Sequence, residues 1–387
     1  MEITQKHTPQ TYQRDPGYFE KLGLFDWLFA AGLLAAALFA LLRFGAYMDI
    51  YEKVILVASA PVFAALGWHW KPVRWLMPVV ALLALWSISM YGGELARGET
   101  KFFLRYMLSS QSAILWMSTL FVFSTIYYWI GLFSRANYGG SVGSKLCWSA
   151  VVLGWTGMMV RWYESYLMGA DVGHIPVSNL YEVFILFALI TAMFYLYYEQ
   201  RYATWQLGPF VMLVIVAAIA FLLWYMVARE DSAQIKPLLP ALQSWWMKIH
   251  VPANFIGYGS FALSAMVGSA YLLKSSGRLV DRLPALEVLD DIMYKSISVG
   301  FAFFTVATIL GALWAADAWG TYWQWDPKET WALIVWANYA AWLHMRLMTG
   351  LRGRVAAWWA LVGLLVTTFA FLGVNMFLSG LHSYGAL

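Results

Sequence analysis

Long apolar runs, separated by short polar segments, repeat along almost the whole chain. Each run is close to the roughly 20 residues that an α-helix needs to cross the hydrocarbon core of a bilayer. The pattern predicts an all-α polytopic membrane protein with about eleven transmembrane helices. The expected spans are 26–43, 53–70, 73–91, 112–134, 147–166, 180–198, 207–228, 252–273, 296–316, 331–349 and 355–378.

Composition agrees with this pattern and excludes several classes of protein. Hydrophobic residues make up 61% of the 387 residues and charged residues 12%, whereas a soluble globular chain is about one quarter charged. The net charge of +4 is spread over the loops and gives no support to nucleic-acid binding. Cys147 is the only cysteine, which excludes an intramolecular disulfide, a cysteine zinc cluster and a CxxC redox pair.

Lysine and arginine predict the orientation, because cytoplasmic loops carry an excess of them. The bias is clearest in the second half, where basic residues at 274–295 and at 346–354 lie toward the same face. We therefore expect the N-terminus inside and the C-terminus outside. The polar stretch 1–26 lacks the features of a signal peptide, so we expect insertion to begin with the first span.

The segment 314–331, on the expected outer face, is crowded with tryptophan. It also holds three carboxylates, a lysine, Gly320 and the turn signal of Asp326 followed by Pro327. An aromatic belt is the simpler interpretation, but a belt needs neither the glycine nor the turn. A flat aromatic surface beside fixed charges suits a large planar ligand with carboxylates, and haem is the candidate. The indoles are those of Trp314, Trp319, Trp323, Trp325 and Trp331.

The specific features lie in the later part of the chain. The loop 137–144, rich in glycine and serine, marks a change of composition. We expect a transmembrane region over 1–140 without a specific motif and a functional region over 141–387.

Two histidines are expected at the same outer face as the tryptophans. His250 stands at the mouth of span 252–273, and His382 lies just past span 355–378. Two neutral imidazoles at one membrane face can supply both axial bonds to a haem iron. Two unrelated interfacial histidines are the alternative.

His344 differs because it lies within span 331–349, at a depth where an ionisable side chain is costly and suggests a function. Alanines precede it by three, four and seven residues, which leaves room for a planar ligand or for close helix packing. His69, near the inner end of the second span, is typical of an interfacial position. His69 is a weak candidate to bind the same molecule together with His344.

One further polar group precedes span 180–198. Pro176, Ser178 and Asn179 predict a turn and a helix N-cap. Glu182, one turn into the span, must be satisfied by water or by a partner.

The run from 318 to 331 resembles the tryptophan-rich WWD signature of haem-handling proteins in cytochrome c maturation. Within that group, the chain is similar to the CcsA (ResC) family of the system II synthetase. The similarity continues through 339–346, 350–354, 373–375 and 380–385, and upstream through 176–182 and around His250. It covers roughly 147–387.

The resemblance implies a haem-handling subunit that acts with a ResB-type membrane partner in the bacterial inner membrane, with an organellar thylakoid membrane as the alternative. Haem b would enter from the inner side and be ligated on the outer face by His250 and His382. His344 would ligate haem at an earlier station, with the second ligand from the partner or an N-terminal helix, where His69 is the candidate. The expected cofactor-binding residues are His344, Trp319, Trp323, Trp325, Asp326, Lys328 and Trp331.

The resemblance also implies the chemistry. An apocytochrome presents a CxxCH segment, its two thiols add across the haem vinyl groups, and its histidine displaces one protein imidazole. The indoles of Trp319, Trp323 and Trp325 would cover the ring, Lys328 would neutralise a propionate, and Asp326 would fix the loop. The contribution of the protein would be positioning and iron ligation.

Three alternatives stay open. The system I haem lyase subunits CcmF and NrfE carry the same signature but are typically much longer. A haem exporter would deliver haem without joining it to protein. A solute transporter with an aromatic gate would more often show two related halves with broken helices, a symmetry that the sequence lacks.

Overall fold

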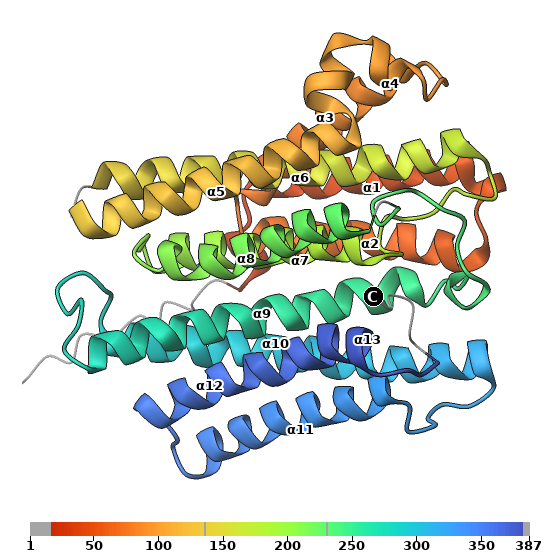
Figure 1. Ribbon diagram of the computed structural model, residues 1–387. Coiled ribbons are helices and arrows are strands. Elements are labelled where there is room, and N and C mark those ends of the chain that lie inside the picture. The colour runs from red at the N-terminus through yellow and green to blue at the C-terminus, as the bar shows by residue number, and fades with distance from the viewer. Residues whose placement is uncertain (1–16, 135–136, 230, 382–387) are drawn as a thin grey trace, which may run out of the picture. The chain divides into compact units, whose positions relative to one another are not determined.

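The computed structural model describes residues 17–134, 137–229 and 231–381 (Figure 1). Within these residues the regular structure is helical, and no strand is present. The helices are α1 (Leu24–Phe44), α2 (Ile50–His69), α3 (Val73–Tyr91), α4 (Arg97–Thr100), α5 (Ser110–Ser134), α6 (Asn137–Met168), α7 (Leu180–Arg201), α8 (Gly208–Ala228), α9 (Met247–Ser275), α10 (Leu286–Trp319), α11 (Pro327–Met348), α12 (Gly353–Thr368) and α13 (Val374–Phe377). Two π-helical turns are present as well: η3 (Leu104–Leu108) precedes α5, and η5 (Phe369–Gly373) lies between α12 and α13.

The expected all-α polytopic membrane fold is confirmed. Each of the expected spans coincides with a helix or, at 355–378, with the continuous run of α12, η5 and α13. Among the described residues, nine helices are long and apolar enough to cross a membrane. The helices α6 and α11 are not in that set, because both carry more polar sequences. The count of about eleven spans and the orientation stay predictions.

Contacts divide the chain into two compact units, Met1–Met77 and Pro78–Leu387. The first unit contains α1, α2 and the start of α3. Asp26 organises it: its carboxylate pairs with Arg74, and its carbonyl accepts a hydrogen bond from Trp68 Nε1 at 2.9 Å. The expected boundary near residue 140 was drawn from motif content and stays a prediction.

In the second unit, α9 is the central helix of the C-terminal half (Figure 1). It packs against α7, α8, α10 and α12. Glycines permit the close approach: a Cβ atom added at Gly257, Gly259 or Gly268 would lie 3.0–3.1 Å from α10, α7 and α12 respectively. Small residues at such contacts are typical of helix packing in membranes. These contacts hold α9 closely against its neighbours.

Candidate functional site

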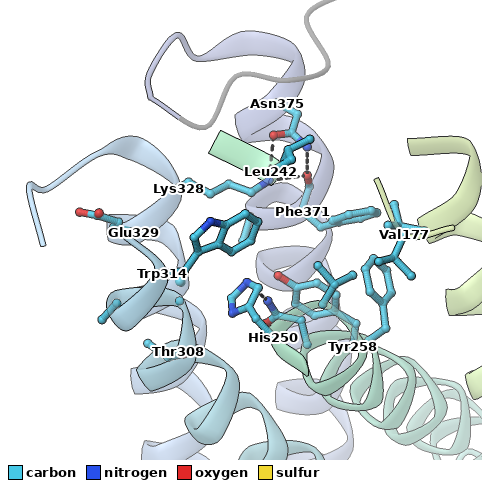
Figure 2. A pocket seen from close by; sticks show the side chains of 18 of the residues that line it. Val177, Leu242, His250, Tyr258, Thr308, Trp314, Lys328, Glu329, Phe371 and Asn375 are labelled. Carbon is cyan, nitrogen blue, oxygen red and sulfur yellow. Dashed lines mark hydrogen bonds between the residues drawn. The ribbon is translucent and has the colours of Figure 1, made fainter. Parts of the chain in front are cut away.

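A cavity lies in the second unit, where the first turns of α9 meet α10, α11 and η5 (Figure 2). Most of its described lining is apolar or aromatic, with a few polar groups among them, as is usual for ligand pockets. The aromatic residues are Phe255, Tyr258, Trp314, Tyr322, Trp323 and Phe371. The polar residues are Ser178, Asn179, His250, Asn254, Thr308, Lys328, Glu329 and Asn375.

His250 projects from the first turn of α9 onto α10. Its Nδ1–H donates to the carbonyl oxygen of Ala307 at 2.8 Å. One turn further along α10, Gly311 lies so close that an added Cβ would stand 2.8 Å from the Cε1 atom of the imidazole. The Trp314 indole makes an edge contact with the same ring, with centroids 5.5 Å apart. These contacts fix the plane and the direction of the imidazole.

The second ring nitrogen of His250 faces an amide. Asn254, one turn along α9, donates from Nδ2 to His250 Nε2 at 2.8 Å. A carbonyl oxygen can only accept, so Nδ1 carries the hydrogen and Nε2 presents its lone pair. Metal-ligating histidines are commonly oriented in this way, by donating the other N–H to a carbonyl. The tautomer is therefore the one that a metal ion would need at Nε2.

Lys328 is the only cation among the described lining residues. Its ammonium group donates to Asn375 Oδ1 at 2.9 Å and to the carbonyl oxygen of Phe371 at 3.1 Å (Figure 2). Phe371 lies in the π-helical turn η5, and π turns are frequent at functional sites. Lys328 precedes the apolar stretch 331–349, and burial lowers the pKa of its ammonium group to about 8, while the nearby Asp326 carboxylate opposes that shift.

The tryptophan-rich segment is built from two helix ends and a short linker. The helix α10 continues through Trp319, and Gly320 ends it in the left-handed conformation, with φ of +79°. Trp314 and Trp323 line the cavity, whereas Trp319, Trp325 and Trp331 are not among its lining residues. Trp325 has φ of +59° and is 67% exposed, and the Trp331 ring lies 4.3 Å from that of Phe369.

Asp326 joins the start of α11 to the end of the described chain. Its side chain caps α11 by accepting from Lys328 N at 3.1 Å, and it also accepts from Leu381 N at 2.7 Å. Glu329 completes a capping box and accepts from Gln324 N at 2.7 Å. The carboxylate of Asp326 is thus used to hold backbone, and Asp326 is not among the cavity residues.

The other expected haem ligands lie elsewhere. His382 is outside the described residues, which end at Leu381. His344 lies one turn from the end of α11 on an exposed face, which it shares with Ala337 and Ala341. His69 is the exposed last residue of α2 and belongs to the first unit. The structure thus brings His250, Trp323 and Lys328 to one cavity, and neither His344 nor His69 is among its lining residues.

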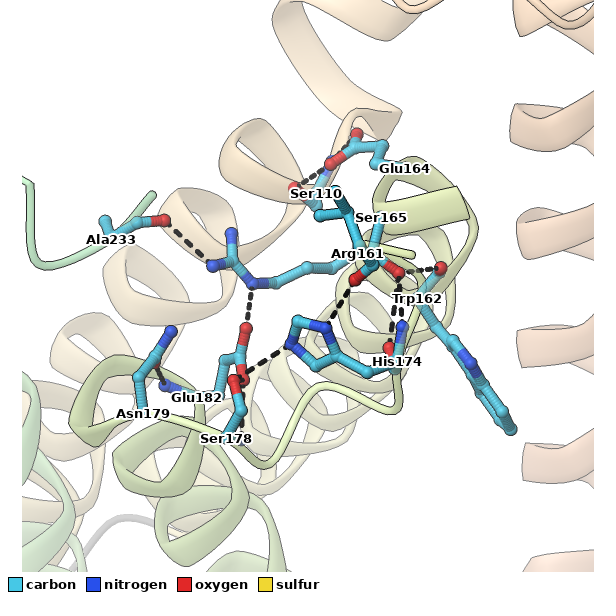
Figure 3. A network of polar contacts seen from close by, with 11 residues as sticks. Ser110, Arg161, Trp162, Glu164, Ser165, His174, Ser178, Asn179, Glu182 and Ala233 are labelled. Carbon is cyan, nitrogen blue, oxygen red and sulfur yellow. Dashed lines mark hydrogen bonds and ion pairs between the residues drawn. The ribbon is translucent and has the colours of Figure 1, made fainter. Parts of the chain in front are cut away.

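A buried polar network positions one wall of the cavity (Figure 3). Asn179 caps α7, as expected, by accepting from Glu182 N at 3.0 Å. Glu182 finds its partner in Arg161 of α6, with Nε and Oε1 2.7 Å apart, and both side chains are almost fully buried. The other carboxylate oxygen accepts from the Ser178 backbone N–H at 2.8 Å. Since Ser178 and Asn179 line the cavity, this ion pair fixes their place.

His174 supports the same loop. Its Nδ1 lies 2.6 Å from the carbonyl oxygen of Val172, and its Nε2 lies 2.9 Å from Ser178 Oγ. His174 is buried and serves to hold the turn before α7. Arg161 also donates to the carbonyl oxygen of Ala233 at 2.8 Å, which ties the loop after α8 to the network.

Sequence reasoning missed three contributors to the site. Asn254 and Gly311 act through their contacts with His250, and the Phe371 carbonyl acts through Lys328. The spacing of His250 and Asn254, four residues apart on one helix, was a signal that could have been found. The place of Gly311 follows only from how α9 and α10 pack.

Comparisons with known proteins point to one family. The sequence model of the family described as "Cytochrome C assembly protein" matches residues 177–382. The cytochrome c biogenesis protein CcsA of Chlorella vulgaris is 33% identical over 305 residues, which cover 68% of this chain and 92% of that protein. The protein of the same name from Parasynechococcus marenigrum is 36% identical over 256 residues, covering 59% and 81%.

A solved structure is similar in fold. It is titled "Cytochrome c Heme Lyase CcmF" and matches with a TM-score of 0.53 at 15% sequence identity. The match covers 69% of this chain and 48% of the CcmF chain, so this chain spans about half of that protein. The cavity described above falls within the residues that the family match covers.

Proposed function

This chain belongs to the cytochrome c assembly protein family, in its CcsA group, and from that premise we propose that it ligates haem at His250 and presents it to an apocytochrome c. Cytochrome c biogenesis is the function of the family, and we take haem and apocytochrome c as the substrates that this role implies. The finer proposal is that the chain is the haem-lyase subunit of a holocytochrome c synthase.

One observation carries the proposal. The Nδ1–H of His250 is bound to the Ala307 carbonyl, so the ring offers Nε2 from a cavity with aromatic walls. Neutral imidazole in this tautomer is the usual axial ligand of haem iron. An aromatic and largely apolar lining suits the faces of a porphyrin.

The cavity also offers a group for a carboxylate. Two of the N–H groups of Lys328 bind Asn375 and Phe371, and an ammonium group has three. We propose that Lys328 binds one propionate of haem b and that His382 supplies the second axial ligand. Trp314 and Trp323 would lie against the ring. Asp326 would act indirectly, by holding the backbone that leads to His382.

The reaction itself needs little from the protein. Each substrate thiol adds across a vinyl double bond, with sulfur bonding to one carbon and the hydrogen going to the other, so no oxidant or reductant is required. The chain would contribute ligation and orientation of haem. The substrate histidine would then replace one of the two protein imidazoles and release the product.

An earlier station for haem is proposed at His344. Its face on α11 is exposed in the described structure, so a second ligand would come from a ResB-type partner or from His69. We place the protein in the bacterial inner membrane, with the cavity on the outer side and an N-terminal motif-free region over 1–140.

Separate scoring of haem binding and of covalent attachment tests the proposal. We expect His250→Ala and His382→Ala to lose the bis-histidine absorption spectrum and the attachment of haem to a co-expressed CxxCH substrate. His344→Ala should reduce the delivery of haem to the outer site. The measurements are the spectrum of the purified complex and haem staining of the denatured cytochrome.

Two results would refute it. Normal haem content with His250→Ala would mean that His250 is not a ligand. Haem binding without any covalent product, in the presence of partner and substrate, would favour a haem exporter over a synthase.

A further inference from the structure

We propose that Asn254 is a positioning residue for haem exchange, because its amide occupies the ring nitrogen of His250 at which iron would bind and must be displaced by haem. The inference rests on the proposed function, since it takes iron ligation at His250 Nε2 as given. It adds a competitor for that nitrogen within the chain itself.

The geometry leaves the amide and the iron no way to share His250. Asn254 Nδ2 lies 2.8 Å from Nε2, and one lone pair on this nitrogen serves either a hydrogen bond or a metal bond. The ring cannot offer Nδ1 instead, because that nitrogen is bound to the Ala307 carbonyl. Gly311 lies against the Cε1 edge of the ring, so the imidazole is confined while the amide side chain faces the cavity.

The displaced amide has other polar groups within the same cavity. One of them is Tyr258, which lies one turn further along α9. We expect rotation of the Asn254 side chain to uncover Nε2 without movement of the α9 backbone. The same rotation in reverse would cover Nε2 again when a substrate histidine takes the iron.

If the Asn254 amide competes with iron, its removal changes haem affinity in a direction that the loss of an ordinary structural contact would not. A hydrogen bond present only in the haem-free state weakens apparent haem affinity, by a factor on the order of 2 to 10 for a bond of usual strength. Removing the amide should therefore tighten haem binding. The spectrum of the bound state should not change, because the amide no longer touches the iron-bound ring.

The test is a titration of the purified full-length protein, from haem-deficient cells, with ferric haem b. We expect Asn254→Leu and Asn254→Ala to bind haem about 2- to 10-fold more tightly than the unmodified chain, with an unchanged Soret band. Thr308→Val is the matched control, because it removes a polar group from the same cavity without touching His250. Its hydroxyl donates to its own helix, to the Phe304 carbonyl at 2.8 Å.

The outcomes separate this inference from the proposed function. If His250→Ala abolishes the spectrum but both Asn254 variants bind no more tightly than Thr308→Val, only the inference on Asn254 is wrong. An altered Soret band in the Asn254 variants would also overturn it, since the amide would then act on the bound state. If His250→Ala leaves haem binding intact, the proposed function itself fails.

Discussion

Gly311 decides whether the His250 ring can lie against α10. An added Cβ would stand 2.8 Å from Cε1 and 3.2 Å from Nδ1 of the imidazole. Gly311→Ala should therefore push the ring off the Ala307 carbonyl and lower haem affinity at least about tenfold, whereas alanine by itself favours the helix. Haem titration and thermal unfolding together would check this.

The matched control is Gly32→Ala in α1. A Cβ added at Gly32 meets nothing within 4 Å, so this variant should keep haem affinity unchanged. Equal haem affinity in Gly311→Ala and Gly32→Ala would show that the contact between α9 and α10 does not set the position of His250.

Lys328 predicts a pH dependence for haem binding. Burial lowers the pKa of its ammonium group to about 8, and a propionate beside it would favour the charged form and raise that pKa. Haem binding should therefore take up a proton above pH 8. Haem affinity should fall as the pH rises from about 8 toward the higher pKa of Lys328 in the complex. The decrease should be at most tenfold per pH unit.

The measurement is a series of haem titrations between about pH 7 and pH 9.5. Lys328→Met should bind haem more weakly near neutral pH and lose the decrease above pH 8. If the decrease persists in Lys328→Met, another group carries it, and the assignment of Lys328 to a propionate is wrong.

At the scale of single residues, the sequence predicted which residue types belong to the site better than it predicted which residues contact one another. His250, Trp323 and Lys328 were expected at one site and line one cavity. Trp319 and Trp325 were expected to cover haem, yet neither is among the lining residues. The direction of an indole depends on the turn that carries it, and the left-handed φ of Trp325 is not visible in composition.

Among the elements, the tryptophan-rich segment is more regular than its sequence indicated. The helix α10 extends from Leu286 to Trp319, well beyond the expected span 296–316, because helical structure can continue outside the hydrocarbon core. The signals that were correctly interpreted are local ones. Asp326 caps α11 with Pro327 at its first position, and Asn179 caps α7, as their residue types favour.

The cap at Asp326 carries a prediction for α11 and for the end of the chain. Asp326→Ala removes the bonds to Lys328 N and Leu381 N. We expect a loss of about 1 kcal/mol of stability from the cap and, beyond that, a weaker bis-histidine spectrum, because the backbone before His382 is released. Thermal unfolding and the absorption spectrum measure the two effects.

Asp49→Ala provides the comparison. Asp49 caps α2 in the same manner, accepting from Glu52 N at 2.7 Å, and has no part in the cavity. It should cost similar stability and leave the spectrum intact. A normal spectrum in both variants would mean that the contact of Asp326 with Leu381 has no bearing on haem.

For the molecule as a whole, the apolar pattern was sufficient to predict helices but not their arrangement. Apolar runs of about 20 residues identify spans because the bilayer sets their length. Nothing in that rule predicts the division between Met77 and Pro78, which follows from how the helices pack. The sequence likewise showed Glu182 only as an acid that needs a partner. Its buried ion pair with Arg161 could not be predicted.

The orientation is testable because the chain has a single cysteine, Cys147, which is buried. In a Cys147→Ser background, we expect Tyr322→Cys to react with a membrane-impermeant maleimide from outside. Val280→Cys should react only after the membrane is opened. Both positions are exposed, Tyr322 at 64% and Val280 at 47%, so the reverse pattern of labelling would invert the proposed topology.

The cavity is assembled from residues as far apart in sequence as Val177 and Asn375. A ribosome must therefore synthesise the chain as far as Asn375 before the cation, the imidazole and the aromatic walls can come together. Free haem is a reactive oxidant, and a chain that stopped before Asn375 would lack the complete cavity in which we propose that haem is held. The proposed binding of the iron porphyrin in this cavity would therefore wait until Asn375 has been synthesised.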